Sequence, residues 1–128
     1  AGFSLIELMI VVEIIGIVVA VAIPSYMRNR IETNESATVG SLHTILTAQI
    51  QFNAGRYVYG TFDQLSAPGS SQFLEASWKE GCVRSGYIYN MVTATASTFQ
   101  CKATPADIGR TGVRTYWIDE SGQITWTE

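Results

Sequence analysis

An apolar run near the N-terminus constrains this chain more than any other feature of its sequence. Within residues 3–23, the only residues that are not strongly apolar are Ser4, Glu7, Glu13 and Gly16. As an α-helix this run is about 30 Å long, which is the thickness of the hydrocarbon core of a bilayer. Each ionised carboxylate near the bilayer centre costs about 2.5–3.5 kcal/mol on insertion scales. A simple anchor would carry none, so we expect a segment that resides in a membrane and also has a second role.

Two residues weaken the predicted helix. Pro24 has no backbone N–H to donate to the carbonyl of Ala20. Gly16 costs about 1 kcal/mol relative to alanine in a helix. We therefore expect the helix to bend or loosen between them. A helical stripe at steps of three or four resumes afterwards, formed by Ile31, Glu35, Val39, Leu42, Leu46 and Ile50 and widened by Ile45 and Phe52. One long helix is predicted from about residue 3 to about residue 54, with Gly55 as its C-terminal stop.

The remaining sequence predicts a connecting loop followed by a sheet. Residues 55–85 are rich in turn residues, and a connector of this length is expected to contain a short helix or strand. Residues 86–128 contain β-branched and aromatic runs, and Glu120-Ser121-Gly122 is a good hairpin turn between two of them. These runs predict an antiparallel sheet of three or four strands.

The predicted fold class is therefore α+β. An N-terminal segment, residues 1–24, is a hydrophobic helical half that protrudes from the rest. A globular domain, residues 25–128, packs its amphipathic helix, residues 25–54, on the antiparallel sheet.

The composition excludes several classes of function. The net charge of −3 argues against nucleic-acid binding driven by charge alone. His43 is the single histidine, and the sequence contains no Gly-x-Ser-x-Gly, Cys–His pair or phosphate-binding loop. We therefore predict no enzyme, no catalytic residue, no cofactor and no metal site.

The two cysteines, Cys82 and Cys101, both follow the long helix. An even number of cysteines in an exported domain favours one disulfide. On the loop-entropy model, a bond between Cys82 and Cys101 would contribute about 3 kcal/mol to stability by closing the loop between them. The alternative is a pair of unrelated buried thiols, and a zinc site is disfavoured because there is one histidine and no second cysteine pair.

The N-terminal residues resemble a known family. The segment Gly2-Phe3-Ser4-Leu5-Ile6-Glu7-Leu8-Met9-Ile10-Val11-Val12, followed by Ile14-Ile15-Gly16-Ile17 and Ala22-Ile23-Pro24, resembles the N-terminus of type IV pilins and of type II secretion pseudopilins. The order of residues and the positions of the glutamate, the glycine and the proline all agree. The rest of the chain agrees in general layout, so the resemblance implies the type IV pilin fold.

The resemblance implies roles for individual residues. A prepilin peptidase would cut after Gly2 and methylate the new terminus at Phe3. Glu7 would meet the terminal amine of a neighbouring subunit as the filament grows. The helices would bundle in the filament core, where the segment between Gly16 and Pro24 would unwind.

The resemblance also implies a structural function. It indicates the major pilin of a type IV pilus-like filament that serves adhesion, twitching motility or DNA uptake. The chain would reside in the bacterial inner membrane and then form an extracellular filament on the cell surface. Its partners would be other copies of itself, the membrane before assembly, the inner-membrane assembly platform, the prepilin peptidase, and surfaces or DNA bound by the filament. The alternatives are a pseudopilin of a type II secretion system and a minor tip pilin with an adhesive or DNA-binding role.

Two features depart from the family pattern. Ala1-Gly2 still precedes Phe3, and Glu13 stands where the family usually has a small apolar residue. Glu7 and Glu13 lie about 9 Å apart along a helix and about 120° apart around it, so they cannot share one partner on the same helix face. We hypothesise that Glu13 also makes an intersubunit polar contact in the filament core, such as one to a neighbour's terminal amine. The alternative is a protonated carboxyl bonded to a backbone carbonyl in the loosened region.

Overall fold

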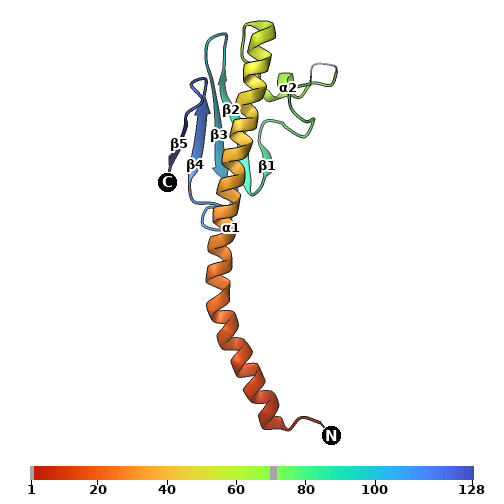
Figure 1. The fold of residues 1–128 in the computed structure, drawn as a ribbon, viewed down its shortest axis with the longest axis vertical. Helices are drawn as coiled ribbons and strands as arrows, with labels where there is room; N and C mark the ends of the chain where they lie inside the picture. Colours follow the sequence, from red (N-terminus) through yellow and green to blue (C-terminus); the bar gives the residue numbers. More distant parts are fainter. Residues whose placement is uncertain (1, 70–71) are drawn as a thin grey trace. The chain divides into compact units, whose positions relative to one another are not determined.

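The computed structural model describes residues 2–69 and 72–128 (Figure 1). The chain divides into two compact units, Ala1–Arg30 and Ile31–Glu128. The elements in chain order are α1 (Leu5–Arg56), α2 (Phe62–Leu65), β1 (Cys82–Arg84), β2 (Tyr87–Ala94), β3 (Phe99–Pro105), β4 (Thr115–Asp119) and β5 (Ile124–Thr127). This long N-terminal apolar helix and antiparallel sheet confirm the predicted α+β class.

In the N-terminal unit, α1 begins at Leu5, directly after a capping serine. The backbone N–H of Glu7 donates to Ser4 Oγ at 3.3 Å, which satisfies one of the N–H groups that a helix start leaves without a partner. Gly16 and Pro24 both lie inside α1. The helix is therefore continuous through the segment that we expected to loosen, and loosening during assembly stays a prediction.

In the second unit, α1 buries a face that only partly coincides with the predicted stripe. Its buried residues are Thr38, Leu42, Ile45, Ala48, Gln49 and Phe52. Ile50, which belonged to the predicted stripe, is 56% exposed, whereas the polar Gln49 is fully buried. Gln49 tolerates burial because its amide makes two bonds to one backbone unit, donating to Gly60 O at 2.7 Å and accepting from Gly60 N–H at 2.9 Å.

The predicted end of α1 at Gly55 is wrong by a short distance. The helix continues to Arg56, and Tyr57 then adopts a left-handed φ of 59° while its N–H donates to Asn53 O at 2.8 Å. The left-handed position that usually favours glycine is thus taken by a tyrosine. The bonds between Gln49 and Gly60 hold the chain where it reverses direction after α1.

The sheet has five strands in the order β1-β2-β3-β4-β5, all antiparallel, rather than three or four. The extra strand, β1, lies in the segment predicted as a loop. It spans three residues, too few for an alternating pattern to show. The short helix α2 lies in the same segment, so the expectation of a short element there is confirmed. Its start is stabilised by a capping box between Thr61 and Gln64.

One face of the sheet forms the core with α1 and α2 (Figure 1). The burial of β3 alternates strictly, with Phe99, Cys101 and Ala103 facing inward. Tyr87 and Tyr89 of β2 and Ile118 of β4 add to the same layer. This period of two is the pattern expected for a sheet with one covered face.

Candidate assembly surface

The side chains of the apolar run are exposed in the structure. Phe3 is 83% exposed, and the least exposed large apolar side chain of the run, Val19, is still 44% exposed. By length and composition, α1 contains a stretch that could cross a membrane. An apolar surface of this extent marks contact with another protein or with lipid.

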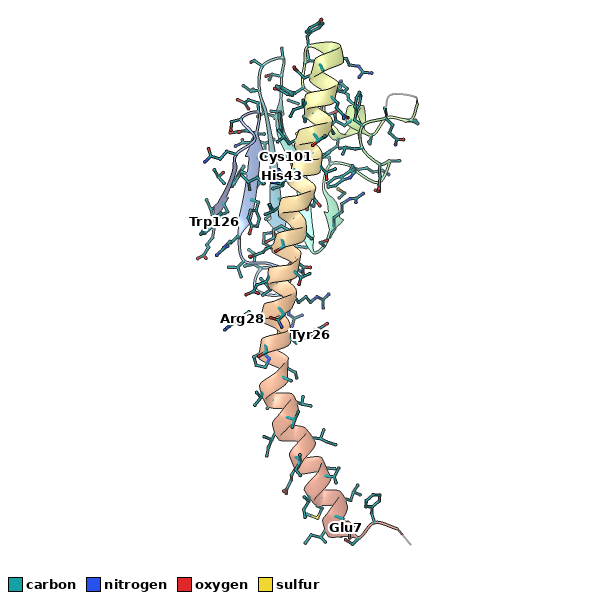
Figure 2. The ribbon with its side chains drawn as sticks, in the orientation of Figure 1. Glu7, Tyr26, Arg28, His43, Cys101 and Trp126 are labelled. Atoms are coloured by element: carbon teal, nitrogen blue, oxygen red, sulfur yellow. The ribbon has the colours of Figure 1, made fainter. Side chains whose placement is uncertain are left out.

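Glu7 and Glu13 are exposed on this surface, as Figure 2 shows for Glu7 near the start of the helix. Among residues 2–69 and 72–128, neither carboxylate forms an ion pair. Ser4 and Glu7 have the Ser-x-x-Glu spacing of a capping box, a signal that would have located the helix start from the sequence. In the structure only the backbone N–H of Glu7 uses this motif, so its carboxylate remains available for another contact.

The predicted processing position lies outside regular structure. Gly2 and Phe3 precede α1, which begins at Leu5, and both are exposed. A peptide bond in this setting is open to a protease, because no helical hydrogen bond has to break before cleavage.

The two cysteines are free thiols in the structure, so the predicted disulfide is absent from it. Cys82 lies in β1 opposite Tyr89 of β2, whereas Cys101 lies in β3 opposite Met91 of β2. Since β2 separates their strands, the cysteines are two strand spacings apart, about 10 Å across the sheet, and disulfide bonding needs Cα atoms within about 7 Å. Pairing would require a change of strand arrangement.

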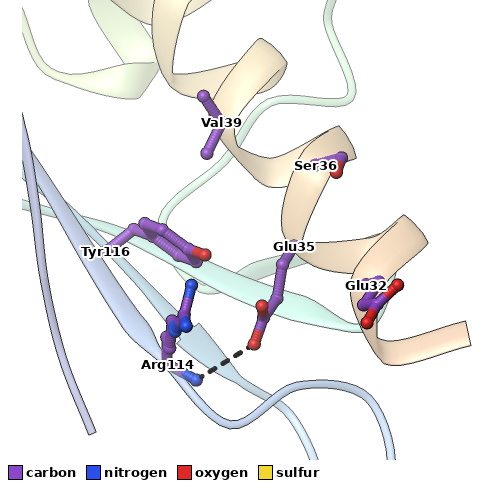
Figure 3. A pocket seen from close by; sticks show the side chains of 6 residues that line it. All are labelled: Glu32, Glu35, Ser36, Val39, Arg114 and Tyr116. Carbon is purple, nitrogen blue, oxygen red and sulfur yellow. Dashed lines mark hydrogen bonds between the residues drawn. The ribbon is translucent and has the colours of Figure 1, made fainter. Parts of the chain in front are cut away.

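A groove in the second unit lies between α1 and the segment that enters β4 (Figure 3). Its lining residues are Glu32, Glu35, Ser36, Val39, Arg114 and Tyr116. The carboxylate of Glu35 accepts the backbone N–H groups of Val113 at 3.2 Å and Arg114 at 3.4 Å. The Arg114 guanidinium lies over the Trp126 ring, 4.2 Å from its centroid.

The contacts around this groove stabilise the fold. Asn34 Nδ2 donates to Thr111 O at 3.0 Å, and the Tyr87 hydroxyl donates to Arg114 O at 2.8 Å. Together with Glu35 they fix the loop between β3 and β4 to the helix and the sheet. Burial, and secondarily the Glu35 charge, raises the pKa of Tyr87 well above its usual range.

His43, the single histidine, is exposed on α1. Among residues 2–69 and 72–128, no three His, Cys, Asp or Glu side chains are grouped so that they could hold a metal ion. The residues with unusual placement are instead the acids of the apolar helix.

The fold and this surface define a class of protein: an α+β domain joined to a long exposed apolar helix, which is a pilin-like arrangement. No protein-family profile matches the chain. The chain is 43% identical over 61 residues to the type IV major pilin protein PilA of Myxococcus xanthus (strain DK1622). It is 49% identical over 47 residues to each of two fimbrial proteins of Pseudomonas aeruginosa.

These matches cover 48% and 37% of this chain, and 28% and 30% of the respective relatives. The chain thus aligns with less than a third of the length of these relatives. Over the aligned part the chain is similar to a type IV major pilin and to fimbrial proteins, in agreement with the resemblance of its N-terminal residues.

Proposed function

We propose that this chain is the major subunit of a type IV pilus-like filament and polymerises through its N-terminal helix. The observation that carries the proposal is the exposed apolar surface of residues 3–23, which bears two carboxylates that form no ion pair among the described residues. In a monomer, only lipid can cover this surface. In a polymer, the same surface of other copies can cover it and can also supply partners for the acids.

The lipid around a monomer and the other copies in a polymer differ most in how they stabilise the two carboxylates. A carboxylate stored in lipid costs about 2.5–3.5 kcal/mol at the bilayer centre, and a neighbouring cation lowers that cost. Glu7 near the helix start is then the contact for the terminal amine of a neighbour, after a prepilin peptidase has cut between Gly2 and Phe3. The amine at Phe3 is attractive for this role because it is created only by processing.

The resemblance of the N-terminal residues to type IV pilins implies the cellular route. Before assembly the chain resides in the bacterial inner membrane. An inner-membrane assembly platform then adds it to a filament that leaves the cell. The segment between Gly16 and Pro24 is the place where α1 loosens as it leaves lipid, since the helix is weakest there. Adhesion, twitching motility and DNA uptake are uses of the finished filament.

The test is the amount of this chain in filaments sheared from cells that produce it. We expect it to be the main protein of the sheared fraction, with Phe3 as its N-terminus by mass spectrometry. Glu7→Ala should lower the filament yield at least about tenfold, the effect of losing about 1.4 kcal/mol per added subunit. Glu32→Ala is the matched control, because Glu32 is an exposed acid on the same helix outside the apolar run.

Retention of the wild-type chain in the membrane fraction, with little in sheared filaments, would contradict the major-pilin role. A short, cell-associated pseudopilus or a tip position would then account for the chain better.

A further inference from the structure

Glu13 is the acid whose partner the family pattern does not supply. It lies at the middle of the apolar run, where a charge in lipid costs most. Side chains on one helix meet at spacings of three or four residues. The first cation after Glu13 is Arg28, about 22 Å farther along the helix. The helix that carries Glu13 therefore cannot neutralise it.

The N-terminal unit nevertheless has balanced side-chain charges. Glu7 and Glu13 lie before Pro24, whereas Arg28 and Arg30 lie after it, and all four are exposed. Figure 2 labels Glu7 and Arg28 on this helix. Among residues 2–69 and 72–128, none of the four takes part in an ion pair. The unit thus presents an acidic segment and a basic segment, displaced along one helix.

This charge pattern selects among arrangements of two copies. Copies inserted into one membrane with the same orientation are parallel. With no axial displacement, Glu13 lies beside Glu13 and the arginines lie beside arginines, which is repulsive. Where α1 keeps its helical rise, an axial displacement of about 22–26 Å instead brings Glu13 of one copy beside Arg28 and Arg30 of the next, and loosening between Gly16 and Pro24 lengthens that displacement.

We infer that Glu13 pairs with the Arg28–Arg30 pair of a second, axially displaced copy, which is not the copy whose terminal amine Glu7 contacts, and thereby sets the displacement between these two subunits. This inference rests on the proposed polymerisation and names its second polar contact. At the same displacement, Glu7 lies beside residues 22–24, which carry no charge. Glu7 therefore needs a different partner, so the two acids have separate roles.

Pairing with arginine suits this position chemically. The guanidinium stays charged in an apolar environment and can bind a carboxylate through two parallel hydrogen bonds. A buried ion pair is often no more stabilising than apolar residues of similar size, but one buried charge left without its partner is strongly destabilising. Glu13 therefore contributes to the choice of displacement more than to the strength of assembly.

The difference between a complete buried ion pair and a single unpaired charge gives a sharp test in cells that assemble filaments of the full chain. Arg28→Ala/Arg30→Ala should lower the yield of sheared filaments at least about tenfold, because Glu13 is left unpaired in the core. Adding Glu13→Ala to that variant should restore the yield to within about twofold of wild type. A triple variant as defective as the double variant would overturn the pairing.

Disulfide cross-linking reports the neighbour directly. In a Cys82→Ala/Cys101→Ala background that still forms filaments, Glu13→Cys is combined with Arg28→Cys or Arg30→Cys. Mass spectrometry should find an intermolecular bond between position 13 and position 28 or 30. Bonds that join only position 13 to position 13, or position 13 to an introduced Phe3→Cys, would overturn the inference. If the wild-type chain forms no filaments, the proposed function itself fails, and the two failures are therefore distinguishable.

Discussion

At the scale of residues, burial separates the two thiols. Cys101 is fully buried, and burial, with the nearby Glu80 charge as a smaller cause, raises the pKa of its thiol well above its usual range. Cys82 is only partly buried in the edge strand β1. Because the thiolate is the reactive form, Cys101 is protected twice, by access and by ionisation.

We predict that in detergent at pH 8 an alkylating reagent modifies Cys82 at least about tenfold faster than Cys101, and that both react at similar rates in denaturant. Mass spectrometry of the intact and digested chain measures both rates. Cys101→Ala, which removes the slow site, is the control for peak assignment. If neither cysteine reacts in denaturant until a reductant is added, the predicted disulfide is present and the arrangement of β1 and β3 in the native protein differs from the one described.

At the scale of elements, the loop between β3 and β4 depends on one glycine. A Cβ added to Gly112 would overlap the hydroxyl of Tyr87, the group that donates to Arg114 O. Tyr87 is fully buried and cannot move away without disturbing the core. Gly40, in contrast, lies exposed in α1, and a Cβ there meets nothing within 4 Å among the described residues.

We predict that Gly112→Ala lowers the free energy of unfolding by at least about 2 kcal/mol, since overpacking also breaks the partly buried hydrogen bond from Tyr87 to Arg114 O. Gly40→Ala should raise it by up to about 1 kcal/mol, because alanine favours the helix. Denaturant titration followed by tryptophan fluorescence in detergent measures both. A Gly112→Ala variant as stable as wild type would show that the loop is not held against Tyr87.

At the scale of the whole molecule, buried tyrosines make the stability sensitive to high pH. Burial is the first cause that raises the pKa values of Tyr87, Tyr89 and Tyr116 above the usual value of about 10. Above that pH the unfolded chain releases these protons while the folded chain keeps them. The unfolded state then binds fewer protons, so stability falls as pH rises.

We predict that these tyrosines leave the free energy of unfolding unchanged between pH 7 and pH 9 and lower it progressively above about pH 10. Denaturant titrations at a series of pH values in detergent measure the decline. Tyr87→Phe should reduce the slope of that decline, because it removes one proton that the folded state retains. The same slope in this variant and in wild type would exclude Tyr87 as a source of the decline.

The features that depend on residues close in sequence were predictable from the sequence. The apolar run, the cap at Ser4 and the positions of Glu7 and Glu13 depend on neighbours a few residues away, so local spacing predicts them. The strands β2 to β5 follow from period-two patterns and turns in the same way. The N-terminal surface was therefore predictable almost completely.

The amino-acid sequence by itself determined the long helix, its acids and the α+β class. Only the tertiary structure decided that Gln49 rather than Ile50 faces the core, and that Glu35 holds the backbone of Val113, which lies 78 residues away. It also decided that β2 separates Cys82 from Cys101. These outcomes depend on groups that are distant in sequence. A buried polar side chain is stable where a hydrogen-bond partner lies within reach, and for Gln49 that partner is the backbone of Gly60.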